Sequence, residues 1–280
     1  MKQGIKRLVK SNRFAHRLAV ELLKIRNWQF LGWLSYLVHR RSGKPYFGAY
    51  LFSKQGSPIR HHYIQAVIDQ MDGPVRALEI GSWAGGSAIS IAERLRAKGG
   101  SLIAVDPWEP YSGQSEPIYR TMDQAARSGK ILEMFLFNIK AAGVNDLVIP
   151  IKASGEFAMK HILRGPFDFA FIDGSHYYKD VLADLTLAKD LVRVGGVLCG
   201  DDLELQFDEC DRIYAEKCTG DFCADPRTGN MFHPGVTRAV HEAFGRVSSW
   251  AGLWAMKRTQ TGWEEVTLPD VPVVIPRHLR

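Results

Sequence analysis

Three aspartates and a histidine in the middle of the chain have the types and spacing that metal-assisted chemistry needs. His176 comes three residues after Asp173, and Asp201 and Asp202 begin 28 residues after Asp173. Carboxylates that converge repel one another unless a cation or a proton lies between them. The favoured interpretation is therefore a divalent metal site, with His176 one turn beyond the first aspartate.

The elements around these residues predict that they do converge. Phe167–Ile172 is an apolar run too short for a helix, and it predicts a strand that ends at Asp173. Tyr177–Leu191 has apolar residues at helical spacing, residues 193–196 predict a turn, and Val197–Gly200 predicts a second strand. A strand, a crossover helix and a strand form a right-handed parallel unit. Both strands then end at the same edge of the sheet, where open α/β folds bind ligands.

A glycine-rich turn lies between two further predicted strands. Val75–Ile80 predicts a buried strand, residues 81–87 (GSWAGGS) form the turn, and residues 88–96 predict a helix. Ser101–Val105 predicts the next strand, and Asp106 follows it. This succession describes a nucleotide-binding half-fold, in which the acid accepts hydrogen bonds from ribose hydroxyls.

The turn differs from the usual phosphate-binding patterns. Gly81, Gly85 and Gly86 do not match the dinucleotide fingerprint, and the turn has no Walker lysine. Glu79, two residues before the first glycine, would repel a phosphate and would suit a ligand that carries a cation.

ALEIGSWAGGSAIS followed by LIAVDPW resembles motifs I and II of the class I S-adenosylmethionine-dependent methyltransferases, over roughly residues 75–258. The resemblance implies a methionine cradle, an ammonium partner, a ribose partner and adenine neighbours. Gly81, Ser82, Gly85 and Ser87 would form the cradle for the methionine part, and Glu79 would bind its ammonium group. Asp106 would bind the ribose, and Pro107, Trp108 and Ser154 would lie beside the adenine. The alternatives are tight strand–helix packing for the small residues and a helix cap for Asp106.

Within that superfamily, FIDGSH with GDD further along resembles the metal-dependent O-methyltransferases. The nearest types are the macrolide-sugar enzymes (mycinamicin and macrocin) and the bacterial cluster labelled cephalosporin hydroxylases. The resemblance implies that Asp173, Asp201 and Asp202 bind Mg²⁺, although Mn²⁺ and Ca²⁺ accept the same oxygen ligands. A vicinal diol could then chelate the metal, which would lower the pKa of its hydroxyl.

His176 is the candidate general base because its ordinary pKa lies near neutrality. The catechol enzymes carry a lysine at the matching position, whereas the macrolide-sugar type carries histidine. Lys179 is a weaker alternative, and a structural interpretation has His176 capping the helix that follows. The structural interpretation of Asp201 and Asp202 is that they end a strand and accept hydrogen bonds from backbone amides. His233, Arg238 and His241 lie where the resemblance places a loop and helix near substrate, although a surface histidine is an equal alternative for His233.

The predicted fold is α/β: a doubly wound, mostly parallel, seven-stranded Rossmann-like sheet with an N-terminal helical appendage. We expect a basic helical appendage at 1–57, a methyltransferase domain at 58–268 with a lid-like insertion at 203–234, and an extended tail at 269–280. Helices are further predicted at 59–71, 115–143, 154–163 and 236–244, and strands at 147–151, 247–256 and 263–268.

The charge is concentrated at the N-terminus. Residues 1–45 hold eleven Lys or Arg and one Glu, about +10, whereas the whole chain carries +6, so the remainder is about −4. We favour a helical cap on the main domain, with contact at the inner face of a membrane as the alternative. Nucleic acid is not expected as a partner, because the basic charge is confined to this arm and the site lacks an aromatic–basic pattern.

The four cysteines (Cys199, Cys210, Cys218 and Cys223) form no CxxC pair. With no secretory signal in the sequence, we expect reduced thiols in a cytoplasmic protein that forms a homo-oligomer. A zinc site from the last three is conceivable, but their spacing matches no zinc-ligand pattern.

The predicted function is S-adenosylmethionine- and Mg²⁺-dependent methylation of a hydroxyl on a sugar, glycan or glycosylated natural product. A catechol or phenol acceptor is the nearest alternative. A membrane-associated scaffold without turnover is the alternative from another class.

Overall fold

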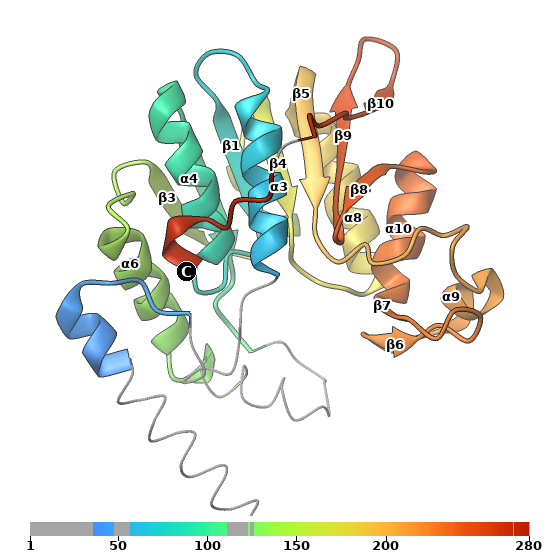
Figure 1. The fold of residues 1–280 in the computed structure, drawn as a ribbon, viewed down its shortest axis with the longest axis horizontal. Coiled ribbons are helices and arrows are strands. Elements are labelled where there is room, and N and C mark those ends of the chain that lie inside the picture. Colours follow the sequence, from blue (N-terminus) through green and yellow to red (C-terminus); the bar gives the residue numbers. More distant parts are fainter. Residues whose placement is uncertain (1–35, 48–56, 111–122, 124–125, 271, 280) are drawn as a thin grey trace, which may run out of the picture.

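The computed structural model describes residues 36–47, 57–110, 123, 126–270 and 272–279. A central sheet lies between two layers of helices (Figure 1). Along the sheet the strands are β10 (Trp263–Glu265), β9 (Leu253–Arg258), β5 (Val192–Gly200), β4 (Phe167–Ile172), β1 (Arg76–Ile80), β2 (Ser101–Asp106) and β3 (Val148–Lys152). This path confirms the predicted doubly wound α/β fold.

Strands β1 to β5 run parallel, and β9 is antiparallel to β5. Beyond the seven strands of the path, β8 (Ser248–Trp250) pairs with residues 253–255 of β9, whereas β10 pairs with residues 256–258. Among the described residues the sheet therefore has eight strands rather than the predicted seven, because the outer edge of β9 is divided between two short strands.

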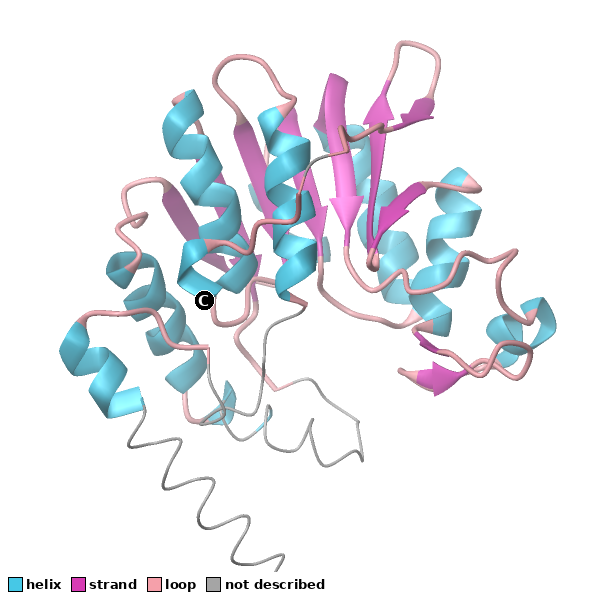
Figure 2. Cartoon of the chain, in the orientation of Figure 1, coloured by secondary structure: helices cyan, strands magenta, loops and turns pink. Residues whose placement is uncertain are grey.

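Helices cover both faces of the sheet (Figure 2). One face packs against α3 (Pro58–Asp69), α4 (Gly86–Lys98) and α6 (Lys130–Ala141). The other packs against the turn α7 (Gly155–Phe157) with η2 (Ala158–Ile162), α8 (Tyr178–Leu191) and α10 (Pro234–Phe244). Alternate residues of a strand pack against opposite helix layers: Phe169 and Phe171 of β4 face the first layer, and Ala170 and Ile172 face the second. This period of two explains why the parallel strands are apolar throughout.

Three predicted elements were wrong in their limits. The single strand expected at 247–256 is two antiparallel strands, β8 and β9, separated by a turn at residues 251–252. The turn expected at 193–196 is part of β5, because the β4–β5 register shifts there and Gly195 takes a φ of +81° within the irregularity. The long helix expected at 115–143 does not run through position 129, where Gly129 has a φ of +71° and precedes α6. Residues 111–122 lie outside the described part of the chain.

The insertion between Asp202 and α10 has its own small structure. It contains α9 (Arg212–Lys217) and a hairpin of β6 (Cys223–Ala224) with β7 (Met231–Phe232). Leu205, Cys210, Ala215 and Phe232 form a separate buried cluster beneath it.

The C-terminal segment is not simply extended along the surface. It ends in a 3-10 turn, η3 (Arg277–Leu279), which places the His278 ring against α4. The imidazole Nε2 lies 3.0 Å from the carbonyl of Gly86 and 3.2 Å from Ser90 Oγ. This segment crosses the helices of the first layer in Figure 1.

At the N-terminal side, residues 36–42 are helical, and the rest of the basic arm through residue 35 lies outside the described residues. Within the described part of the chain, every helix is too short or too polar to cross a membrane.

Candidate cofactor and metal site

The acidic cluster forms where β4 and β5 end beside each other. The backbone N–H of Asp173 donates to Ile80 O at 2.8 Å, and that of Asp201 donates to Ile172 O at 3.2 Å. These bonds extend the parallel ladder past the strand ends, so the next side chains share one edge of the sheet. One oxygen from each of Asp173, Asp201 and Asp202 lies within 4.8 Å of the others. The structure thus brings the three predicted aspartates together.

An arginine that the sequence did not indicate joins this cluster. Arg60 of α3 places Nη1 2.8 Å from Asp201 Oδ1 and 2.7 Å from Asp202 Oδ1, and Nη2 2.8 Å from Glu204 Oε1. Its Nε donates to Ala251 O at 2.7 Å. A single guanidinium therefore faces three carboxylates. Burial alone would lower the pKa of Arg60, but the charges of Asp201 and Asp202 and the hydrogen bonds to Asp202 and Glu204 outweigh burial and raise this already high pKa further.

Burial and mutual repulsion set the protonation of the aspartates. Burial raises the pKa of Asp201 to about 7, with the charge of Asp202 acting in the same direction and Arg60 opposing it. Burial, together with Asp201 and Asp202, raises the pKa of Asp173 well above its usual range. For Asp202, the hydrogen bond from His176 and the nearby cations outweigh burial and lower the pKa. The cluster therefore attracts cations strongly, since binding one allows all three groups to ionise.

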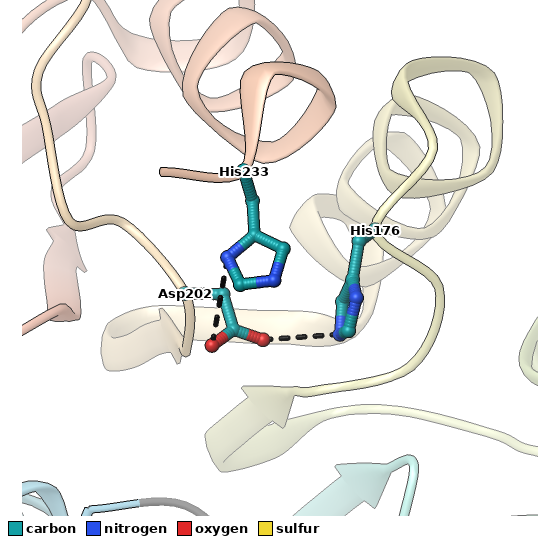
Figure 3. A group of neighbouring side chains, drawn as sticks. All are labelled: His176, Asp202 and His233. Atoms are coloured by element: carbon teal, nitrogen blue, oxygen red, sulfur yellow. Dashed lines mark ion pairs between the residues drawn. The ribbon is translucent and has the colours of Figure 1, made fainter. Parts of the chain in front are cut away.

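His176 lies between two carboxylates. Its Nε2 is 3.0 Å from Asp202 Oδ2 and its Nδ1 is 3.0 Å from Asp221 Oδ1. Figure 3 shows its ring beside Asp202, with His233 on the other side of that carboxylate. The amide of Tyr177 donates to Ser175 Oγ at 3.2 Å, and no side chain in the described part of the chain caps the start of α8. The alternative role of His176 as a helix cap is therefore wrong. The alternative base Lys179 has an exposed side chain.

His233 is the second imidazole of the site. Its Nδ1 lies 3.0 Å from Glu204 Oε2 and 3.9 Å from Asp202 Oδ1. Burial would lower its pKa, but the hydrogen bond to Glu204 and the nearby acids raise it. Arg238 lies over the ring of Tyr178, and His241 stacks on Phe207, so these two neighbours in sequence have other partners.

The glycine turn lies directly against the acidic cluster. A Cβ at Gly81, where φ is +92°, would collide with the backbone carbonyl of Asp173. Ser82 Oγ donates to Glu79 Oε2 at 2.5 Å, whereas Glu79 Oε1 is buried with no hydrogen-bond partner among the described residues. Burial raises the pKa of Glu79 to about 7. An orphaned buried carboxylate oxygen beside a glycine turn fits a ligand that brings a cationic donor, as the ammonium group of S-adenosylmethionine would.

Gly85 and Ser87 begin α4 on the same turn. Gly85 has a φ of +88° and precedes the helix, and a Cβ there would press on Phe135 at 3.0 Å. Ser87 is buried in the first helical turn. Both positions thus suit tight packing as well as a ligand cradle.

Asp106 organises the adjoining loop. Its carboxylate accepts the amides of Trp83 at 2.9 Å and Trp108 at 2.6 Å, and its burial raises the pKa. Trp108 is buried against Phe135, with ring centroids 5.0 Å apart, whereas Pro107 is exposed. Ser154 caps α7 by accepting the amide of Phe157 at 3.3 Å. The ribose and adenine roles of these residues stay predictions.

The donor sets fit a metal ion in two overlapping ways. The three aspartates offer only oxygen, which suits a hard divalent cation, and Asp201 Oδ1 accepts no well-aligned hydrogen bond although Arg60 lies beside it. His176, Asp202 and His233 form a second group of ligand atoms within 4.8 Å of one another. Because Arg60 contacts Asp201 and Asp202, a cation must share these oxygens with it or displace it.

Sequence reasoning missed Arg60, Glu204 and Asp221. Arg60 and Asp221 are isolated charged residues far along the chain from the strand ends, and only the packing of α3 and of the insertion brings them there. The sole local signal was the nearness of Glu204 to Asp201 and Asp202.

Comparisons with known proteins support the assignment of the domain. Residues 78–203 match a family model for a methyltransferase domain, and this span contains the glycine turn and all three aspartates. A search of curated protein sequences found no match.

Two solved structures are similar in fold. One is cofactor-bound Rv0187 from MTB, with 18% identity and a TM-score of 0.51 over 80% of this chain and 88% of that chain. The other is the O-methyltransferase from Bacillus cereus in complex with SAH, with 21% identity and a TM-score of 0.51 over 75% of this chain and 86% of that chain. The matched model and the shared fold agree with what the two motifs implied: residues 78–203 match a methyltransferase domain, and the chain has the fold of an S-adenosylmethionine-dependent O-methyltransferase.

Proposed function

We propose that the protein transfers the methyl group of S-adenosylmethionine to a hydroxyl oxygen of a sugar or glycosylated natural product, with Mg²⁺ bound at the acidic cluster. One observation carries this proposal. Gly81 of the cofactor turn and Asp173 of the acidic cluster are in backbone contact. A methyl donor in the turn and a hydroxyl at the cluster would therefore be neighbours, which is the arrangement that in-line transfer needs.

Asp173, Asp201 and Asp202 would hold the cation, which when bound supplies charge that lowers the pKa of an acceptor hydroxyl. Arg60 adds a fixed positive charge beside Asp201 and Asp202. It lessens their repulsion and limits how many of their oxygens face the ligand. The bacterial O-methyltransferase noted above supports oxygen as the acceptor atom.

His176 would take the acceptor proton at Nε2. With a proton on Nδ1 donated to Asp221, Nε2 would be the basic nitrogen of the neutral ring. For this, the hydrogen bond that Nε2 now donates to Asp202 would have to give way to the acceptor hydroxyl. The methyl group then leaves the sulfonium as the oxygen attacks, and the products are S-adenosylhomocysteine, the methyl ether and a proton on His176. Asp221 has a positioning role, because it orients the ring and fixes the tautomer.

Calorimetric titration of S-adenosylmethionine and of Mg²⁺ into chelator-treated protein tests this function. Wild type should bind both. Asp201→Ala should lose the metal and keep the cofactor, and His176→Ala should keep both but lose methyl transfer to sugar diols. Asp208→Asn, an exposed acid paired with Arg246, is the matched control.

Cofactor binding without any metal would overturn the metal-assisted mechanism and leave a methyltransferase of another type. Methylation of catechols but not of sugar diols would overturn the acceptor class. Failure to bind either ligand would favour the scaffold interpretation.

A further inference from the structure

Two cysteines lie on either side of the carboxylate that holds His176. Cys218 follows α9, Cys223 begins β6, and Asp221 lies between them. Their Sγ atoms are 3.2 Å apart, and both residues are half-buried. Cys199 and Cys210, in contrast, are buried. The insertion therefore presents one pair of accessible thiols already in contact.

We propose that Cys218 and Cys223 are a redox modification site, at which a reversible disulfide fixes the segment that holds the catalytic histidine. The bond forms by thiol–disulfide exchange with a small disulfide such as oxidised glutathione. The Cys218 thiolate attacks the oxidant, which releases one glutathione thiolate and leaves a mixed disulfide. Cys223 then displaces the second glutathione. The protein loses two electrons and two protons, and the oxidant is reduced to two thiols.

The local structure permits this closure. Gly220 allows it, because a Cβ there would meet Cys223 Sγ at 2.5 Å. Tyr214 of α9 lies near both sulfurs, and they raise the pKa of its hydroxyl. Burial and the neighbouring sulfur raise the pKa of Cys223 to about 11, which makes Cys223 a poor first nucleophile and suits it to resolving the mixed disulfide.

The segment between the thiols reaches both imidazoles of the site. Asp221 contacts His176, and the ring of Phe222 lies 4.6 Å from that of His233. The disulfide would close a covalent loop around residues 219–222 and so constrain these contacts. The contact between the thiols does not depend on the proposed function, but its effect on catalysis through His176 does.

The first test is peptide mapping of the native full-length protein after treatment with oxidised glutathione near pH 8.5. Trypsin cleaves after Lys217 and Arg227, so one peptide holds both cysteines. We expect this peptide to lose the mass of two hydrogen atoms, and to regain it with dithiothreitol. Cys218→Ser and Cys223→Ser should abolish the loss, whereas Cys210→Ser, in the same insertion, should retain it. A persistent glutathione adduct without closure, or no oxidation of this peptide, would overturn the proposal.

The second test is the imidazole NMR spectrum of the reduced and oxidised protein. The signals of His176 and His233 should shift on oxidation, and they should not shift in Cys223→Ser treated in the same way. Closure with unchanged histidine signals would overturn the link to the site. Because this readout needs no acceptor, it stays informative even if the proposed methyl acceptor is wrong.

Discussion

Arg60 Nη1 lies 2.7 Å from Asp202 Oδ1, so a helix that precedes the whole sheet supplies a cation to the end of β5. The site accommodates this side chain because position 252 is glycine: a Cβ there would collide with the guanidinium. The acidic cluster is thus balanced in part by the protein itself.

Arg60→Ala should destabilise the protein by about 3–5 kcal/mol, since it leaves buried carboxylates without their partner. Urea unfolding measures the loss, and Mg²⁺ should restore more stability to this variant than to wild type. Arg246→Ala, which breaks only exposed ion pairs, should leave the urea unfolding curve almost unchanged. An Arg60→Ala protein as stable as wild type, and indifferent to Mg²⁺, would contradict the cation-sharing account.

Gly81→Ala should destabilise the protein and abolish cofactor binding, because the backbone carbonyl of Asp173 occupies the space of the new methyl group. Gly143→Ala is the matched control: its φ is +70°, but nothing lies within 4 Å of its Cβ. The control should lose only about 1–2 kcal/mol from left-handed strain. Thermal unfolding and cofactor titration distinguish the two, and equal losses would show that the contact with Asp173 is unimportant.

Cofactor affinity should rise about tenfold between pH 6 and pH 8, as Glu79 with its pKa of about 7 becomes ionised and can pair with the cofactor ammonium group. Glu79→Gln should bind weakly at both pH values. Calorimetry over this range measures the effect, and the exposed Glu133→Gln serves as control. A pH dependence that survives in Glu79→Gln would assign it to another group.

Asp184→Asn should stabilise the protein at pH 8 and leave it nearly unchanged at pH 4. Burial raises the pKa of Asp184 to about 7 in the folded state, so the folded protein binds more protons than the unfolded chain between pH 4 and pH 7. Stability is therefore lost as pH rises through this window, by up to about 4 kcal/mol. Denaturant unfolding at both pH values tests this, with the exposed Asp190→Asn on the same helix as control.

The sequence predicted the positions of site residues best where these residues directly follow a strand. Asp173, Asp201 and Asp202 could be placed together because parallel neighbours end at one edge, and the glycine turn could be placed because its strand and helix are local. Arg60 and Asp221 could not, since their positions depend on how α3 and the insertion pack. The strand through Gly195 and Gly196 was mistaken for a turn, because a sheet irregularity and a loop use the same residues.

The charges around His176 and Arg60 also limit what can enter the site. Five carboxylates, from Asp173, Asp201, Asp202, Glu204 and Asp221, face one guanidinium and two imidazoles. When these carboxylates are ionised and no cation is bound, a phosphorylated molecule, such as a nucleotide-linked sugar, would meet net repulsion on approach, whereas a neutral polyol would not. We therefore expect the proposed acceptor to be a hydroxyl compound that carries no anionic group.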